Sequence, residues 1–544
     1  MSQKTKEQWE YGDFQTPSDL TKQAISVLVK LRIQPCSVLE PTCGKGSFLL
    51  SAAQAFSSAH ELIGVDINEQ YLNDLKTRVA EIDKKKRICL ISGDFFTLDW
   101  QEILSALPEP ILIVGNPPWV TSAELGLLKS KNLPQKSNFH VRRGYDAITG
   151  KSNFDISEWM LLKHFEWLRE HRGTIAMLCK TAVARKLLAH SWKNDIPISL
   201  AHIYIIDAQK YFGASVDACF FVVTLLGGAD SKNCSVYKTL TDGQASYTIG
   251  YHDGLVISNV EKYEKYKHLK GIDYSYKWRS GIKHDCAKVM ELEPDSQQYR
   301  NGFGERITIE NDYLYPMLKS SDIGNGDVRF GRKYMIVTQR FVGEDTNIIK
   351  RTAPKTWLYL ENHDEALSKR ASAIYRNRPK FSIFGVGRYS FSPWKVVISG
   401  FYKRLAFKVV GLYEGKPIVM DDTVYFLPCW SEAEARLIAH VLNSQPAIDF
   451  FESIIFWEDK RPITIEILKQ LDLQALSAEL GRETDYLRFA WQRHDRESEE
   501  TEGQLSLGIA EKKPLNIKGK QRITNRSRRT LQKAAAPLNF HVIS

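Results

Sequence analysis

The stretch Ile111-Leu-Ile-Val-Gly-Asn-Pro-Pro-Trp119 is the part of this sequence that decides the expected fold. Its first four residues form an uninterrupted apolar run, which is typical of a parallel strand buried on both faces. An amide, two prolines and an aromatic residue follow the run, so the pattern predicts a strand that ends in a loop. A Pro-Pro turn beside a core Trp is also common after a strand, so the stretch needs support from elsewhere in the sequence.

Pro117 and Pro118 make the expected loop stiff. Neither has an N–H group, and each disfavours the helical region for the preceding residue, so Asn116 and Pro117 are held extended. The side-chain oxygen of Asn116 and the carbonyl of Pro117 can then converge on one donor group, such as an exocyclic amine. Trp119 offers a flat face to a ring. The loop therefore predicts a pocket for an aminated base.

Three further strand patterns lie upstream, and each ends in polar residues. The segment from Ser37 to Leu50, SVLEPTCGKGSFLL, predicts a strand, a glycine turn and a helix, as in a Rossmann-type nucleotide-binding unit. Leu62-Ile-Gly-Val-Asp66 predicts a strand whose terminal acid suits a ribose diol. A third strand leads into Asp94 and Phe95. Because open α/β sheets bind ligands at the carboxyl ends of their strands, the four patterns together predict one ligand site.

The glycine turn allows several nucleotide cofactors, and the remaining residues choose among them. Gly44-Lys45 is followed by Gly46, where a Walker phosphate loop requires Ser or Thr. A nicotinamide dehydrogenase would use the glycine turn but leaves Glu40 and the Asn-Pro-Pro-Trp loop unexplained. S-adenosylmethionine accounts for all of them. Upstream, Gly12-Asp-Phe-Gln-Thr-Pro17 precedes a helical apolar pattern, with Ser18 as its expected N-cap.

Composition bounds the class of protein. The chain has 544 residues, 43% hydrophobic and 25% charged, which predicts two to four ordinary globular domains. No apolar run approaches about 18 residues and the N-terminus is polar, so we expect no membrane span, no secretory signal and a cytoplasmic location. The eight cysteines and thirteen histidines show no zinc spacing, so no metal is expected.

Positive charge is concentrated in two segments without any acidic residue. Residues 366–413 carry ten Lys or Arg and residues 512–544 carry nine, whereas the whole chain has a formal net charge of +10. The rest of the chain is therefore net negative. In the first segment the cations alternate with aromatic residues, which is typical of a DNA-binding surface, although a basic β-rich face with core aromatics has the same pattern. The DNA contacts that we predict are Arg378, Arg388, Lys395 and Arg404.

The order of motifs resembles the TaqI-like, gamma-class DNA adenine-N6 methyltransferases, and the match is specific over residues 11–225. The resemblance implies a Rossmann-like class I methyltransferase α/β sheet with helices on both faces, and S-adenosylmethionine as cofactor. It implies cofactor contacts for Phe14, Gln15, Thr16, Glu40, Pro41, Cys43, Gly44, Gly46, Asp66, Asp94 and Phe95. It implies a catalytic role for Asn116, Pro117, Pro118 and Trp119, with Trp119 and Phe212 stacking on the flipped-out target base.

The domain organisation follows from the loss of regular strand and helix patterns after Thr224. We expect a catalytic domain over residues 1–240 and a mixed α+β target-recognition domain over 241–475. A charged helix and a basic, flexible tail are expected over 476–544. Double-stranded DNA is the expected partner, and the resemblance also implies a restriction-modification system with a separate cognate restriction endonuclease.

The reaction expected from these residues is direct methyl transfer to N6 of a flipped-out adenine. The family's commoner Tyr is Trp119 here, which keeps a stacking face and leaves cytosine N4 open as a target. RNA or a protein glutamine are alternatives that use the same loop, but neither requires the second half of the chain. A non-catalytic DNA-binding module is disfavoured by the complete set of cofactor motifs.

Overall fold

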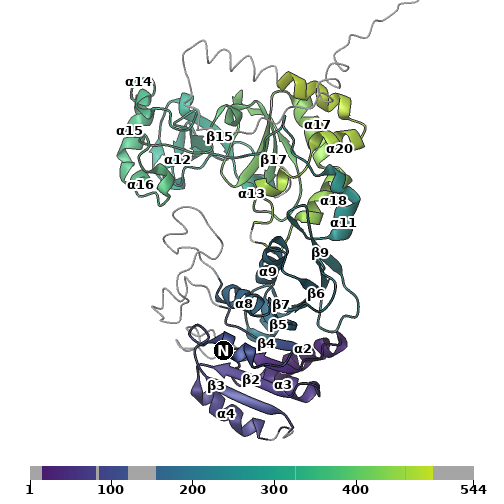
Figure 1. The fold of residues 1–544 in the computed structure, drawn as a ribbon. Coiled ribbons are helices and arrows are strands. Elements are labelled where there is room, and N and C mark those ends of the chain that lie inside the picture. The colour runs from purple at the N-terminus through teal and green to yellow at the C-terminus, as the bar shows by residue number, and fades with distance from the viewer. Residues whose placement is uncertain are drawn as a thin grey trace, which may run out of the picture. The chain divides into compact units, whose positions relative to one another are not determined.

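The computed structural model describes residues 15–80, 82, 85–119, 155–324, 326, 328–459 and 461–493. The chain divides into two units, Met1–Glu261 and Lys262–Ser544, and each is considered by itself (Figure 1). Phe14 and the expected tail beyond residue 493 lie outside the described residues. No helix in the described part of the chain is long and apolar enough to cross a membrane.

The first unit is built on one ten-stranded sheet. Its central strands follow the order β3-β2-β1-β4-β5-β7-β6, in which β7 is antiparallel to both of its neighbours and the others are parallel. Their bounds are β1 (Ser37–Glu40), β2 (Glu61–Asp66), β3 (Arg87–Ser92), β4 (Ile111–Gly115), β5 (Gly173–Lys180), β6 (Ile198–Ile206) and β7 (Ala218–Leu225). Strands β8 (Asn233–Tyr237), β9 (Tyr247–His252) and β10 (Leu255–Ile257) extend the sheet beyond the boundary expected at residue 240.

The four strands expected from sequence are β1 to β4, and β4 is buried along its whole length. The sheet order places β4 between β1 and β5, at the middle of the parallel strands. The order in which strands are added to the sheet reverses at β1. Strands β2 and β3 lie on one side of it, and β4 and β5 lie on the other. Such a switch point opens a crevice at the carboxyl ends of the strands, where the predicted polar residues lie.

Helices precede and connect the strands of this sheet. They are α2 (Ser18–Lys30), α3 (Ser47–Ala55), α4 (Glu69–Val79), α5 (Trp100–Ser105), α8 (Ile156–Trp167), α9 (Thr181–Lys193) and α10 (Ala208–Phe212). Helix α2 forms because its apolar residues recur at helical spacing, and the buried ones include Leu20, Ala24 and Leu28. The expected cap was wrong by one residue: Pro17 precedes the helix without a side-chain hydrogen bond, and Ser18 is the first helical residue.

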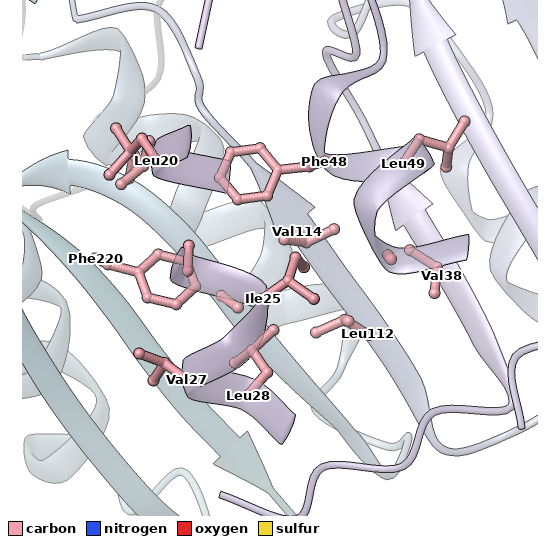
Figure 2. Packing of buried hydrophobic residues seen from close by; sticks show 14 of the residues in the cluster. Leu20, Ile25, Val27, Leu28, Val38, Phe48, Leu49, Leu112, Val114 and Phe220 are labelled. Atoms are coloured by element: carbon pink, nitrogen blue, oxygen red, sulfur yellow. The ribbon is translucent and has the colours of Figure 1, made fainter. Parts of the chain in front are cut away.

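Helices α2 and α3 bury their apolar faces against the sheet in one core (Figure 2). Phe48 of α3 stacks on Phe220 of β7, with ring centroids 6.4 Å apart and planes 11° from parallel. Leu112 and Val114 of β4 face the same core. Replacing a buried Phe of this kind with Ala costs about 3–5 kcal/mol, so this packing fixes the position of the helix that follows the glycine turn.

The second unit is mostly antiparallel, with sheets ordered β11-β22-β17-β18, β14-β13-β12-β16-β15-β21 and β19-β20. The strands are β11 (Arg279–Ser280), β12 (Glu291–Asp295), β13 (Gln298–Arg300), β14 (Arg306–Ile307), β15 (Leu314–Leu318), β16 (Tyr334–Ile336), β17 (Trp394–Ser399), β18 (Lys408–Val410), β19 (Leu412–Tyr413), β20 (Lys416–Pro417), β21 (Val419–Met420) and β22 (Val424–Cys429). The helices are α11 (Val260–Tyr266), which begins just before the division between the units, α12 (Ala287–Met290), α13 (Ser320–Gly324), α14 (Ile349–Thr352), α15 (Pro354–Asn362), α16 (Asp364–Ser368), α17 (Glu432–Leu442), α18 (Gln445–Ile454), α19 (Ile465–Leu468) and α20 (Leu473–Glu479). The expected fold class, a class I methyltransferase sheet followed by further mixed structure, is confirmed.

Candidate cofactor and methyl-transfer site

The glycine turn joins β1 to α3 and requires glycine at two positions. Gly44 has φ +50° and Gly46 has φ +72°, a conformation that side chains with a Cβ rarely adopt. A Cβ on Gly46 would lie 2.5 Å from the Leu75 side chain. The backbone N–H of Gly46 donates to the Cys43 carbonyl at 2.7 Å, and that of Cys43 to the Val65 carbonyl at 2.8 Å. The turn is therefore held tightly against β2.

The carboxylates at the ends of β1 and β2 both turn toward the glycine turn. Asp66 accepts a hydrogen bond from the Gly44 N–H at 2.6 Å and another from the Asn68 N–H at 2.8 Å. Glu40 is buried and accepts from the Leu49 N–H at 2.8 Å, near the start of α3. Burial, followed by the field of Asp66, raises the pKa of Glu40 well above its ordinary value. The structure thus gives Glu40 a capping contact with α3 that the sequence did not predict.

The N-terminal motif contacts both the glycine turn and the loop that follows β4. Gln15 accepts a hydrogen bond from the Lys45 N–H at 3.2 Å, and a Cβ on Gly44 would lie only 2.9 Å from Gln15 Nε2, too close for this arrangement. Thr16 accepts from Asn116 Nδ2 at 3.2 Å, across a hundred residues of sequence. The structure therefore brings three separate motifs of the predicted site together.

The loop after β4 leads two aromatic side chains to one another. Trp119 and Phe212 make an edge-to-face contact, with centroids 5.2 Å apart and planes at 69°, and both are largely buried. The indole Nε1 of Trp119 donates to the Leu178 carbonyl at 3.3 Å. Phe212 ends the short helix α10, before β7. The two residues predicted to stack on a target base are thus neighbours.

Lys180 and Asp155 belong to this site, and the sequence analysis did not assign them to it. Lys180, at the end of β5, donates to the Trp119 carbonyl at 3.3 Å and to Asp155 Oδ2 at 2.6 Å. Asp155 also caps α8, because its Oδ1 accepts from the Ser157 N–H at 3.0 Å. Lys180 reaches the loop because β5 pairs with β4, and the sequence alone does not reveal that pairing.

The third strand end leads into a cluster of aromatic rings. Asp94 accepts from the Phe96 N–H at 2.9 Å, which fixes the turn after β3. Phe95 is buried, and its ring centroid lies 5.2–6.1 Å from those of its neighbours in the cluster: Trp100, Phe96, Trp159, His164 and Trp167. Burial lowers the pKa of His164 to about 3, so this ring is neutral at physiological pH. The sequence analysis singled out only Asp94 and Phe95 here.

The predicted DNA contacts in the second unit separate into two kinds. Arg378, Arg388 and Arg404 are exposed, and Arg404 lines a cavity of about 120 Å³. Lys395 is 1% exposed, and its ammonium donates to the Ser392 carbonyl at 2.6 Å. A phosphate cannot reach an ammonium that strand β17 buries, so the prediction that Lys395 contacts DNA is wrong.

No group of three or more His, Cys, Asp or Glu within the described ranges is arranged to hold a metal ion. The strand-end residues, in contrast, fit S-adenosylmethionine. The left-handed glycines admit a ligand close to the backbone, and Asp66 presents a carboxylate to hydroxyl groups at the end of β2. Phe95 and its neighbours offer apolar surface for a purine.

The sheet order and this site define a class I, S-adenosylmethionine-dependent methyltransferase. The model of the N-6 DNA Methylase family matches residues 1–189. The type II methyltransferase M.NspV of Nostoc sp. (strain ATCC 29411 / PCC 7524) is 44% identical over 470 residues, which cover 86% of this chain and 97% of that protein. The chain therefore belongs to the type II methyltransferase family, and it is an adenine-N6 DNA methyltransferase.

Two more distant proteins are similar over much of the chain. The type II methyltransferase M.BanIII of Aneurinibacillus aneurinilyticus is 23% identical over 461 residues, which cover 69% of this chain and 74% of that protein. Among solved structures, the type IIL restriction-modification enzyme MmeI in complex with DNA has 13% identity and a TM-score of 0.48, over 86% of this chain and 68% of that one.

Proposed function

We propose that the loop Asn116 to Trp119 carries out methyl transfer to a flipped-out adenine, as in the gamma-class enzymes. The observation that supports this most directly is the hydrogen bond from Asn116 Nδ2 to Thr16 Oγ1. It links the loop to the segment whose Gln15 contacts the glycine turn. The groups proposed for the target base and for the cofactor are thereby connected.

The proposed chemistry depends on two acceptors. The amine of adenine is a poor nucleophile because its lone pair is delocalised into the ring. When Asn116 Oδ1 and the Pro117 carbonyl each accept a hydrogen bond from this amine, the nitrogen becomes pyramidal and its lone pair can attack the methyl carbon. The carbon–sulfur bond breaks as the carbon–nitrogen bond forms, and the methylated nitrogen then loses one proton to solvent. Bound S-adenosylmethionine supplies the electrophilic methyl group on its sulfonium. Each well-placed acceptor of this type is worth on the order of 3–4 kcal/mol.

We propose that Thr16 orients the side-chain amide of Asn116. Because Asn116 Nδ2 donates to Thr16, the amide is held with its nitrogen toward the N-terminal segment. Lys180 fixes the other end of the loop through the Trp119 carbonyl. Trp119 and Phe212 are the proposed stacking surface, and they offset part of the cost of unstacking the base.

We assign residues 241–475 to recognition of the DNA sequence, with Arg378, Arg388 and Arg404 as candidate contacts. The basic segment 512–544, with its nine cations, is proposed to add loose, salt-sensitive attraction to phosphates. We further propose a cytoplasmic location, because the substrate is cellular DNA, and a separate restriction endonuclease that recognises the same sequence and cuts it when it is unmethylated. If that pairing holds, DNA methylated by this protein resists the endonuclease and unmethylated DNA does not.

The test of the proposed site uses S-adenosylmethionine with a labelled methyl group and, in separate reactions, unmethylated plasmid DNA, total RNA and an extract of soluble proteins. The DNA is then digested to nucleosides and analysed by mass spectrometry. We expect N6-methyladenine in the labelled nucleoside and no label in RNA or protein. The Asn116→Ala variant should lose the product while Asn73→Ala, at an exposed position on α4, keeps it. Label in N4-methylcytosine, RNA or protein glutamine would overturn the assignment.

A further inference from the structure

A turn in the second unit carries two large apolar residues at its tip. Residues 338–346 connect β16 to the 3-10 helix Thr346–Ile348. The Glu344 N–H donates to the Phe341 carbonyl at 3.2 Å, and Gly343 has φ +91°. This is the geometry of a type II β-turn, in which the third residue needs a positive φ. Phe341 and Val342 therefore occupy its first two positions.

The frame of the turn is fixed by a buried side chain. Gln339 is 1% exposed; its Nε2 donates to the Glu344 carbonyl at 2.6 Å, and its Oε1 accepts from the Ile383 N–H at 2.9 Å. One amide thus closes the turn and ties it to the neighbouring segment. The Glu344 carboxylate accepts from the Arg340 N–H and closes the turn a second time.

Two threonines fasten the flanks of the turn to the acid-free segment. Thr338 Oγ1 donates to the Phe381 carbonyl at 2.7 Å, and Thr346 Oγ1 donates to the Lys380 carbonyl at 2.6 Å. Both flanks are therefore held by the backbone of residues 380–381, and these hydrogen bonds position the tip before any ligand binds. Preorganisation of this kind reduces the entropy lost on binding.

The tip is apolar and exposed where turns are ordinarily polar. The side chain of Phe341 is 58% exposed and that of Val342 is 42% exposed. Single exposed apolar residues are common on protein surfaces and need no explanation. Here two adjacent apolar residues, Phe341 and Val342, project from a turn that side-chain hydrogen bonds hold in one conformation. A fixed apolar projection of this kind can insert between stacked groups.

Charges of both signs lie beside this tip, because Glu344 and Asp345 follow Gly343 and the Glu344 carboxylate accepts from the Arg340 N–H. Arg340 is the residue before Phe341 and is exposed, and Arg378 Nη1 lies 4.0 Å from the position that a Cβ of Gly343 would occupy. Cations beside an apolar tip match duplex DNA, which presents phosphates on either side of its stacked bases.

We propose that Phe341 and Val342 form an apolar wedge that enters the base stack of the recognition sequence and unstacks one base step. The proposal rests on duplex DNA as the substrate of this enzyme. Arg340 and Arg378 hold the flanking phosphates, and the opened step gives the enzyme a sequence preference through its flexibility, because pyrimidine–purine steps unstack most easily.

The test replaces purines of the methylated sequence, one at a time and outside the target adenine, with fluorescent 2-aminopurine. We expect wild-type enzyme to raise the fluorescence at one position and Phe341→Ala to abolish the rise, while Phe341→Trp keeps it. Phe341→Ala should weaken DNA binding about tenfold, and an abasic site at the same step should restore affinity to within about threefold of wild type. Leu358→Ala is the matched control, since Leu358 is also 58% exposed and lies on α15.

Three outcomes overturn the wedge. One is that wild-type enzyme leaves every 2-aminopurine outside the target without a rise in fluorescence, and another is that the rise persists in Phe341→Ala. A change in self-association of Phe341→Ala, with the DNA signals intact, would make the tip a contact between two copies and would also overturn it. If wild-type enzyme methylates no duplex, the proposed function itself has failed, which is a separate result.

Discussion

The strand-end site of the first unit and the cationic segment of the second unit were predicted from different kinds of evidence. In the first unit each polar residue follows a strand, and a topological rule brings the strand ends together. In the second unit the cations were chosen by composition, which does not distinguish an exposed arginine from a buried lysine. Lys395 shows the difference, because it belongs to the same acid-free segment as Arg388 yet is buried in β17.

The largest effect that would test the strand-end site comes from Asn116→Ala. We expect turnover to fall by more than about 100-fold, since the lost acceptor is worth on the order of 3–4 kcal/mol in the transition state. Affinities for S-adenosylmethionine and DNA should stay within about threefold of wild type, as measured by calorimetry and fluorescence anisotropy. A variant that retains more than about a tenth of wild-type turnover would remove Asn116 from the catalytic role.

The cationic segment should show a smaller effect that depends on the DNA sequence. Substituting Arg378, Arg388 or Arg404 with Ala should, for at least one of them, cost about 1–3 kcal/mol of binding to the methylated sequence. The same variant should lose its preference at one base pair, measured by competition with singly altered duplexes. Equal weakening on every duplex, for all three, would make them phosphate contacts only.

Asp66→Ala should act on binding and hardly at all on turnover. A ribose contact is shared by the ground state and the transition state, so its loss should raise the dissociation constant for S-adenosylmethionine by roughly tenfold. Turnover at saturating cofactor should remain within about threefold. Asp66 also holds the Gly44 N–H, so the thermal unfolding of the variant is measured alongside. An unchanged dissociation constant would contradict the ribose role.

Lys395→Met should leave DNA affinity unchanged and instead alter how stability depends on pH. Burial lowers the pKa of Lys395 to about 7 in the folded protein, against about 10.4 in an unfolded chain. Between these values the unfolded chain binds more protons, so raising the pH stabilises wild type relative to the variant. Urea unfolding at pH 7 and pH 10 measures this. Weaker DNA binding by a variant that is still folded would return Lys395 to the interface.

Much of the first unit could be predicted because its signals are local. The glycine turn, the acid at the end of β2 and the loop after β4 are each contained in a few residues, and one rule gathers them. Lys180 could not be found this way, because its contact with the Trp119 carbonyl depends on β5 lying beside β4. Trp159 and Trp167 were missed because aromatic residues on an apolar helix look the same whether they form a core or border a site.

The second unit was harder because its strands are short and its pairings are distant in sequence. Strand β17 pairs with β22, from Trp394 opposite Cys429 to Ser399 opposite Val424, and no local sequence pattern predicts that pairing. Lys395 gave no local signal of its burial. It precedes three apolar residues, Val396 to Ile398, and lysine is almost never fully buried, so its place inside the sheet depends on the pairing of β17 with β22.

The hydrogen bond between Asn116 and Thr16 has a thermodynamic consequence. Segment 15–16 contacts the glycine turn on one side and the side-chain amide of Asn116 on the other, so under the proposed roles the cofactor and the target base both act on the same few atoms. Thermodynamic linkage then requires reciprocity. If bound S-adenosylmethionine raises the affinity for a flipped base by some factor, the bound base raises the affinity for S-adenosylmethionine by the same factor. The spent cofactor, which lacks the methyl group, need not share that factor, and a difference between the two would favour release of DNA only after transfer.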